Sequence, residues 1–280
     1  MKFNFAAISR RPTPIRIGLF LLMLFAMWLP LKIPIEWAVS IFYGATDAAR
    51  NIASILTYIV LYAEFIVLVK LWGRYIYQEP LFRAYGLRQP RQNWRNFGQG
   101  LAIGLGSLLL MFALQGILGW VQWQVPVSTF PRILLEGGII AISVGFVEEL
   151  FFRGWLLNEL DREYSPRISL GVSSLIFALV HGIRPQFFAL VIFGSILVWA
   201  KRATRGRLGL SIGFHAGIVW GYYLVNVGQL VTFSNRVPAW VTGIDRNPLA
   251  GVVGILALST IAFLMRSAAL RSSVRFKGRE

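Results

Sequence analysis

Long apolar stretches recur along this chain, and they constrain its fold more than any other feature. Hydrophobic residues make up 56% of the 280 residues, and only 14% are charged, whereas a soluble domain has about 25% charged residues. An apolar stretch of about 20 residues can cross about 30 Å of hydrocarbon as a helix. We therefore expect an all-α, polytopic integral membrane protein with about eight transmembrane helices. The candidate spans are 17–35, 53–71, 99–120, 133–152, 168–183, 187–200, 208–227 and 249–266.

The basic residues between these spans predict the orientation of the chain. If the N-terminus lies in the cytoplasm, most of the 28 Lys and Arg residues fall in cytoplasmic segments, as the positive-inside rule requires. Eight spans with both termini cytoplasmic satisfy this rule. The net charge of +16 therefore indicates the lipid bilayer as a partner and does not indicate nucleic acid. We expect the plasma membrane as the location, with a thylakoid or another internal membrane left open.

No repeat and no long linker divides the chain. We expect residues 1–280 to form a single membrane domain, with a motif-bearing core at about 133–227. The chain has no Cys, which excludes disulfides, thiolate nucleophiles and thiolate metal ligands. Small-residue stripes occur in the third span (Gly100, Gly104) and in the seventh (Gly213, Gly217, Gly221). Such stripes let helix backbones approach closely, so they predict helix packing.

Charged groups stand inside the fourth apolar run, in VGFVEELFFRG. On a helix, Glu149 and Arg153 are four residues apart and can pair. Glu148 is rotated by about 100° from Glu149 and points elsewhere, so one carboxylate is neutralised while the other faces a neighbouring helix. The alternative is an ion pair that fixes helix packing without any catalytic role. Charged residues within a membrane are costly and usually functional.

The two histidines of the chain also lie in apolar runs. His181 ends the fifth span and His215 lies in the seventh, roughly opposite the glycine stripe. Each could be a core histidine bonded to a helix carbonyl. Together with the carboxylates, however, they supply a base for water, a proton donor and a group that polarises a carbonyl. Glu148 and Glu149 approach one end of the fourth span and His181 the opposite end of the fifth, so the groups meet only if the span boundaries shift or the helices are staggered.

These residues resemble the motifs of the CAAX protease and bacteriocin-processing family of intramembrane proteases, also called the Abi family. The matching features are E-E-x-x-x-R at Glu148, Glu149 and Arg153, F-x-x-x-H at Phe177 and His181, and the later His215. The resemblance implies helices around a membrane-embedded cavity. It implies that Glu148 activates water with help from His181, that His215 stabilises the oxyanion, and that Glu149 and Arg153 organise the site.

Metal dependence is left open by the resemblance, because the family mechanism has been interpreted both with and without a metal. The chain has no H-E-x-x-H motif, and its two histidines fall on different helices, so the spacing gives a metal site little support. We expect metal-free hydrolysis and no cofactor, with a divalent metal left open. One departure is Val219, where the family often has an Asn that acts as a second oxyanion donor.

The function that we expect is an intramembrane endopeptidase acting on membrane-associated protein or peptide substrates. The alternative is a catalytically weak or inactive protein of this fold that acts as a binding or assembly factor for other membrane proteins. A transporter with a proton relay is disfavoured because the chain shows no repeat symmetry. Nothing in the sequence encodes a preference for prenylated substrates.

Overall fold

The computed structural model describes residues 5–124 and 128–277, and most of these residues are helical. The chain divides into two compact units, Met1–Ala84 and Tyr85–Glu280, which are described here separately. The single membrane domain expected from the sequence stays a prediction.

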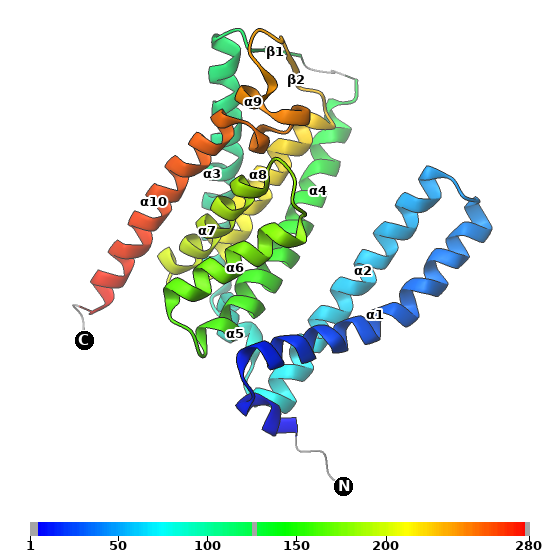
Figure 1. Cartoon of the computed structure of the whole chain (residues 1–280), viewed down its shortest axis with the longest axis vertical. Helices are drawn as coiled ribbons and strands as arrows, with labels where there is room; N and C mark the ends of the chain where they lie inside the picture. The colour runs from blue at the N-terminus through cyan, green and yellow to red at the C-terminus, as the bar shows by residue number, and fades with distance from the viewer. Residues whose placement is uncertain (1–4, 125–127, 278–280) are drawn as a thin grey trace. The chain divides into compact units, whose positions relative to one another are not determined.

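The first unit is a helical hairpin. The short η1 (Phe5–Arg10) precedes α1 (Thr13–Tyr43), and α2 (Asp47–Trp72) continues into the π-helix η2 (Gly73–Tyr77). Figure 1 shows α1 and α2 side by side in blue and cyan. The Thr46 hydroxyl caps α2 by accepting a hydrogen bond from the Ala49 N–H at 3.1 Å, which satisfies one free donor of the first turn. The ring of Phe20 packs edge-on against Trp72, with the ring centroids 5.2 Å apart.

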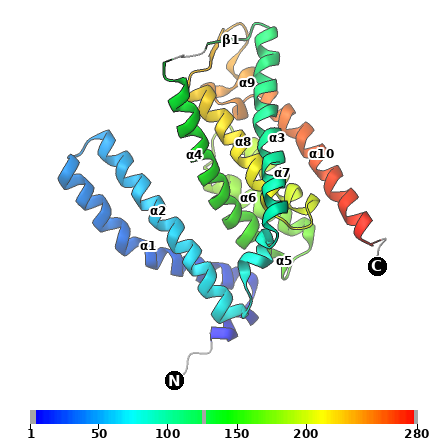
Figure 2. The ribbon, with the colours of Figure 1, turned by 180° about the vertical axis from the view of Figure 1, so that it is seen from behind.

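The second unit is a helical bundle. Its boundary falls within the π-helix η3 (Arg83–Leu87). The elements that follow are α3 (Pro90–Ile117), β1 (Val121–Trp123), α4 (Phe130–Glu149), the π-helix η4 (Leu150–Leu156), α5 (Leu157–Asp161), α6 (Pro166–Val180), α7 (Phe187–Ala203), α8 (Gly209–Asn226), β2 (Val231–Phe233), α9 (Ala239–Thr242), η5 (Ile244–Arg246), η6 (Pro248–Ala250) and α10 (Val252–Lys277). Figure 2 shows α8 between α3 and α4, and α7 lies against α6, α8 and α10.

The glycine stripes bring α3 and α8 into backbone contact. A Cβ atom on Gly213 would lie 2.0 Å from the carbonyl oxygen of Phe97, and one on Gly100 would lie 2.3 Å from that of Leu210. Real Cβ atoms do not approach backbone this closely, so only glycine fits at these two positions. The predicted packing role of the stripes is therefore confirmed. This contact turns the other face of α8, which carries His215, toward α4 and α7.

A two-stranded antiparallel sheet closes one end of the bundle. Val121 of β1 pairs with Phe233 of β2, and Trp123 pairs with Val231. The sheet joins the segment after α3 to the segment after α8. The sequence predicts an all-α fold, so these two short strands differ from the prediction.

Each predicted span contains a helix. Within the described residues, four helical segments are long and apolar enough to cross a membrane: Thr13–Tyr43, Asp47–Tyr77, Pro90–Ile117 and Val252–Val274. The helix Pro166–Val180 is apolar but shorter, so the number of eight spans stays a prediction. The helical backbone of the fourth predicted span continues beyond 152, from α4 through η4 and α5 to Asp161, and the end of the span itself stays a prediction.

Candidate active site

The two adjacent carboxylates lie where α4 passes into the π-helix η4. A π-helix bonds each residue to the fifth one along and widens the backbone, and such segments are frequent at functional sites. Helical structure continues beyond Glu148 and Glu149 for the seven residues of η4 and the five of α5. The carboxylates therefore lie inside a long helical segment and not at its end. This position removes the mismatch with His181 that the predicted span boundary creates.

Glu149 and Arg153 form a fully buried ion pair. Arg153 Nη1 donates to Glu149 Oε1 at 2.8 Å, and both side chains are 0% exposed. Arg153 Nη2 donates to the Gly194 carbonyl of α7 at 3.0 Å. The guanidinium also lies 4.5 Å from the centroid of the Phe177 ring, which is a cation–π distance. The pairing predicted from the four-residue spacing is confirmed, and α6 and α7 hold the arginine in place.

Lys201 and Asn158 support the backbone of the π-helix. Lys201 Nζ, near the end of α7, donates to the Arg153 carbonyl at 2.6 Å. The Asn158 side-chain amide donates to the Gly154 carbonyl. Lys201 is buried, although it follows directly after the predicted span 187–200. Its partner lies 48 positions earlier, and no periodic pattern in the sequence marks such a contact.

His215 approaches the ion pair from α8. Its Nδ1–H donates to Glu149 Oε1 at 3.0 Å, and its ring is buried. The ring stands edge-on to Phe193 of α7, with the centroids 5.2 Å apart. Glu149 thus accepts from both Arg153 and His215, and this arrangement fixes the direction of the imidazole.

His181 follows the last turn of α6 and is more open than His215. Its Nδ1–H donates to the Phe177 carbonyl at 2.7 Å, and its side chain is 33% exposed. The next residue, Gly182, has φ +86°, a left-handed conformation that ends a helix readily when the residue is glycine. The helix end therefore sets the position of the imidazole.

Glu148 lies between the two imidazoles. Its Oε2 is 3.7 Å from His181 Nε2 and 3.9 Å from His215 Nε2. Within residues 5–124 and 128–277, this oxygen accepts no hydrogen bond. The Glu148 side chain is 22% exposed, although Oε2 itself is buried. The cluster is therefore more exposed at Glu148 and His181 than at Glu149 and His215.

In each of the two histidines, the hydrogen bond made by Nδ1 determines whether Nε2 is a hydrogen-bond donor or acceptor. A carbonyl or a carboxylate only accepts, so both Nδ1 atoms carry hydrogen. In a neutral imidazole the Nε2 atom is then an acceptor. Glu148 Oε2 and the two Nε2 atoms form a group of acceptors at distances slightly too long for direct hydrogen bonds. A water molecule has two O–H donors and can bridge two of these three acceptors.

The same side chains do not form a metal site as they stand. Among the residues that the structure describes, no group of three or more His, Cys, Asp or Glu side chains could hold a metal ion. Both Nδ1 atoms are already used, by Phe177 and by Glu149.

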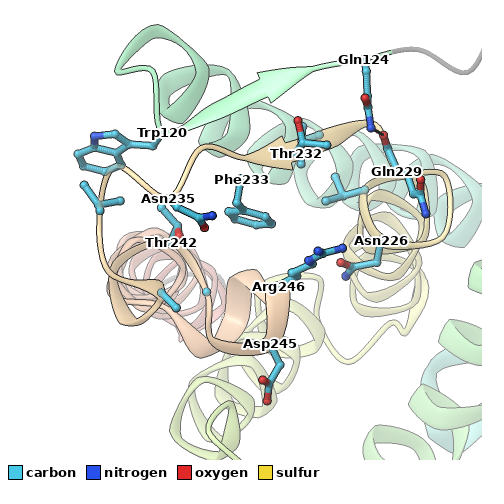
Figure 3. A pocket seen from close by; sticks show the side chains of 15 residues that line it. Trp120, Gln124, Asn226, Gln229, Thr232, Phe233, Asn235, Thr242, Asp245 and Arg246 are labelled. Atoms are coloured by element: carbon cyan, nitrogen blue, oxygen red, sulfur yellow. Dashed lines mark hydrogen bonds between the residues drawn. The ribbon is translucent and has the colours of Figure 1, made fainter.

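A separate cavity of about 340 Å³ lies under the two-stranded sheet at the end of α8 (Figure 3). Asn226, Phe233 and Arg246 are among the residues that line it, and none of the predicted site residues does. Asn226 therefore belongs to this cavity, which agrees with its position well beyond His215 along α8. It does not replace the Asn that the family often has at position 219, where this chain has Val219.

Comparison with known proteins gives one family match. Residues 128–221 match the family model described as Type II CAAX prenyl endopeptidase Rce1-like. The comparisons with curated proteins and with solved structures gave no match. The matched segment runs from the start of α4 to α8 and contains Glu148, Glu149, Arg153, Phe177, His181 and His215. This segment of the chain is therefore similar to the Rce1-like CAAX prenyl endopeptidases.

Proposed function

We propose that this protein is an intramembrane endopeptidase that hydrolyses peptide bonds of membrane-associated protein or peptide substrates. The observation that carries the proposal is the position of Glu148, whose free Oε2 lies within 4 Å of two imidazole Nε2 atoms. A carboxylate with a free oxygen beside two imidazoles can hold a water molecule and accept its proton. The partial exposure of Glu148 and His181 supports entry of a substrate from that side.

In the proposed mechanism, Glu148 is the general base and His181 helps it to orient the water. Glu148 removes a proton as the water oxygen attacks the carbonyl carbon of the scissile bond. The carbonyl C–O double bond becomes a C–O⁻ single bond. When the tetrahedral intermediate collapses, the C–N bond breaks and protonated Glu148 returns its proton to the leaving nitrogen. The products are a carboxylic acid and an amine, and transfer of the remaining hydroxyl proton to the amine gives a carboxylate and an ammonium group. No metal takes part in this proposed sequence.

His215 is proposed to stabilise the oxyanion. Its Nδ1 is bonded to Glu149, and its Nε2 lies 3.9 Å from Glu148 Oε2. A hydrogen-bond donor at this position can stabilise a developing oxyanion. Glu149 and Arg153 act as positioning residues.

Val219 supports the alternative of a weak or inactive enzyme. Loss of one oxyanion donor typically lowers the rate by about 10²–10³-fold. Ser173 is a candidate replacement donor, because its hydroxyl is buried and, within the described residues, has no hydrogen-bond partner. A binding or assembly factor for other membrane proteins is the function that this alternative predicts.

The test of the proposal is a Glu148→Gln variant, which keeps the size of the side chain and removes the base. Purified wild-type and variant proteins in liposomes are incubated with a library of membrane-inserting peptides, and new peptide ends are identified by mass spectrometry. Removal of a general base is expected to lower cleavage by about 10²–10⁴-fold. Glu136→Gln is the matched control, because Glu136 lies on the same helix, paired with the exposed Arg132.

Equal cleavage by wild type and Glu148→Gln would refute this mechanism. The binding-factor alternative would be favoured by three results together. The wild type would not cleave the peptides, the Glu148→Gln variant would keep its function in vivo, and partner proteins would co-purify with the variant. The orientation with both termini cytoplasmic, and the plasma membrane as the location, are also proposals. Labelling of single cysteines introduced at the termini tests the orientation.

A further inference from the structure

A large groove opens where the start of α6, the end of α7 and the later part of α10 meet. Its volume is about 980 Å³. We call it the basic groove because four of its lining residues are arginines. They are Arg167 of α6, Arg202 of α7, Arg205 of the following turn and Arg266 of α10.

The positive charge of the basic groove is largely uncompensated. Arg202 donates to the Pro166 carbonyl at 2.8 Å and lies 3.7 Å from Asp161. In the part of the chain that the structure describes, Arg167, Arg205 and Arg266 have no carboxylate within salt-bridge distance. One carboxylate thus faces four guanidiniums. Such a surface attracts an anion.

The fold holds Arg205 at this groove. Its φ is +57°, a left-handed conformation that residues other than glycine rarely adopt. The turn is fixed by the Gly206 N–H, which donates to the Lys201 carbonyl at 2.9 Å. An unfavourable backbone conformation that persists in a fold often marks a functional position.

The basic groove also has apolar lining residues, on the same helices as the arginines. They are Leu170, Trp199, Ala269 and Leu270, and Leu270 is 57% exposed. A ligand that matches both kinds of residue must combine an anionic group with a hydrocarbon part. The distribution of Lys and Arg places this end of the helices on the cytoplasmic side of the membrane, where anionic lipids give the leaflet a negative potential.

We propose that the basic groove binds the phosphate-bearing headgroup of an anionic phospholipid, with an acyl chain along Leu170 and Leu270. Guanidinium groups bind phosphate oxygens through paired hydrogen bonds, and Trp199 suits the boundary between headgroups and hydrocarbon. Inorganic phosphate is also an anion, but it has no hydrocarbon part to contact the apolar lining residues. This site is separate from the cluster around Glu148, and its lipid binding does not depend on proteolysis.

The experiment uses the full chain in nanodiscs and compares three probes: phosphatidylcholine alone, phosphatidylcholine with phosphatidylglycerol, and inorganic phosphate. Bound phosphatidylglycerol is counted by native mass spectrometry and its affinity is measured by titration. The variant Arg205→Gln/Arg266→Gln is compared with Arg91→Gln/Arg95→Gln. The latter pair is exposed on α3, falls in a predicted cytoplasmic segment and lies outside the groove.

The wild type and the Arg91/Arg95 control are expected to retain phosphatidylglycerol and to bind phosphatidylcholine and inorganic phosphate weakly. Loss of two arginine contacts is expected to weaken phosphatidylglycerol binding by about 30-fold, with no change in the melting temperature in phosphatidylcholine. Unchanged binding by the groove variant, an equal loss in the control, or equally tight binding of inorganic phosphate would overturn the proposal. If the double variant does not fold, Arg205→Gln and Arg266→Gln are tested singly, each with an expected loss of about fivefold.

Discussion

Replacing Arg153 by Met leaves the Glu149 carboxylate buried without its guanidinium. The two side chains are 0% exposed and their charged atoms are 2.8 Å apart, so water cannot replace the lost partner. Breaking a buried ion pair in this way costs about 3–5 kcal/mol of unfolding free energy. His215 still donates to Glu149, so we expect a loss near the lower end of this range. At about 2–4 °C per kcal/mol, the melting temperature falls by about 6–12 °C.

The double variant Glu149→Gln/Arg153→Met separates the ion pair from general packing. It removes both charges together, so it is expected to recover about 1–3 kcal/mol relative to Arg153→Met. Thermal unfolding of the purified protein in detergent, followed by tryptophan fluorescence, measures both effects.

Arg132→Met is the matched control. It breaks another i,i+4 ion pair on the same helix, with Glu136, and the side chains of this pair are 78% and 42% exposed. Exposed pairs contribute little, so the melting temperature is expected to change very little. The reasoning fails if Arg153→Met melts no lower than Arg132→Met, or if the double variant is no more stable than Arg153→Met.

Two further variants test the packing around the site. Gly213→Ala places a Cβ atom 2.0 Å from the Phe97 carbonyl oxygen, so α8 must shift and the melting temperature should fall strongly. Gly106→Ala on α3 enters open space and should not lower the melting temperature. Equal effects of the two variants would contradict the close contact of α3 and α8. Lys201→Met removes a donor from the Arg153 carbonyl, with an expected cost of about 1–3 kcal/mol in the same unfolding assay, and an unchanged melting temperature would contradict this support of the π-helix.

Local patterns in the sequence predict the helices and one ion pair. In hydrocarbon, backbone groups must be bonded within the chain, so apolar stretches predict helices, and each predicted span does contain one. The pairing of Glu149 with Arg153 follows from one helical turn. The helix packing at Gly100 and Gly213 follows from the absence of side chains there. The helices, the ion pair and the glycine stripes are patterns of residues close in sequence, so they can be found there, whereas the helix that each stripe contacts cannot.

Other features depend on contacts between distant segments and had no visible pattern. The continuation of α4 through η4 to Asp161 involves Lys201, which bonds a carbonyl on another helix. The two-stranded sheet pairs Val121 with Phe233 through a few residues that lie outside the apolar runs. Periodicity describes one element at a time, so it detects neither feature.

The sequence by itself determined that the chain is a helical membrane protein with two carboxylates, an arginine and two histidines in apolar runs. Only the tertiary structure decided that His215 bonds Glu149 and that both Nε2 atoms lie near Glu148. The reason is geometric: the rotation of α8 is set by backbone contact with α3, and the position of His181 is set by the end of α6. The spacing of the site residues in the sequence encodes neither the rotation of α8 nor the position of His181.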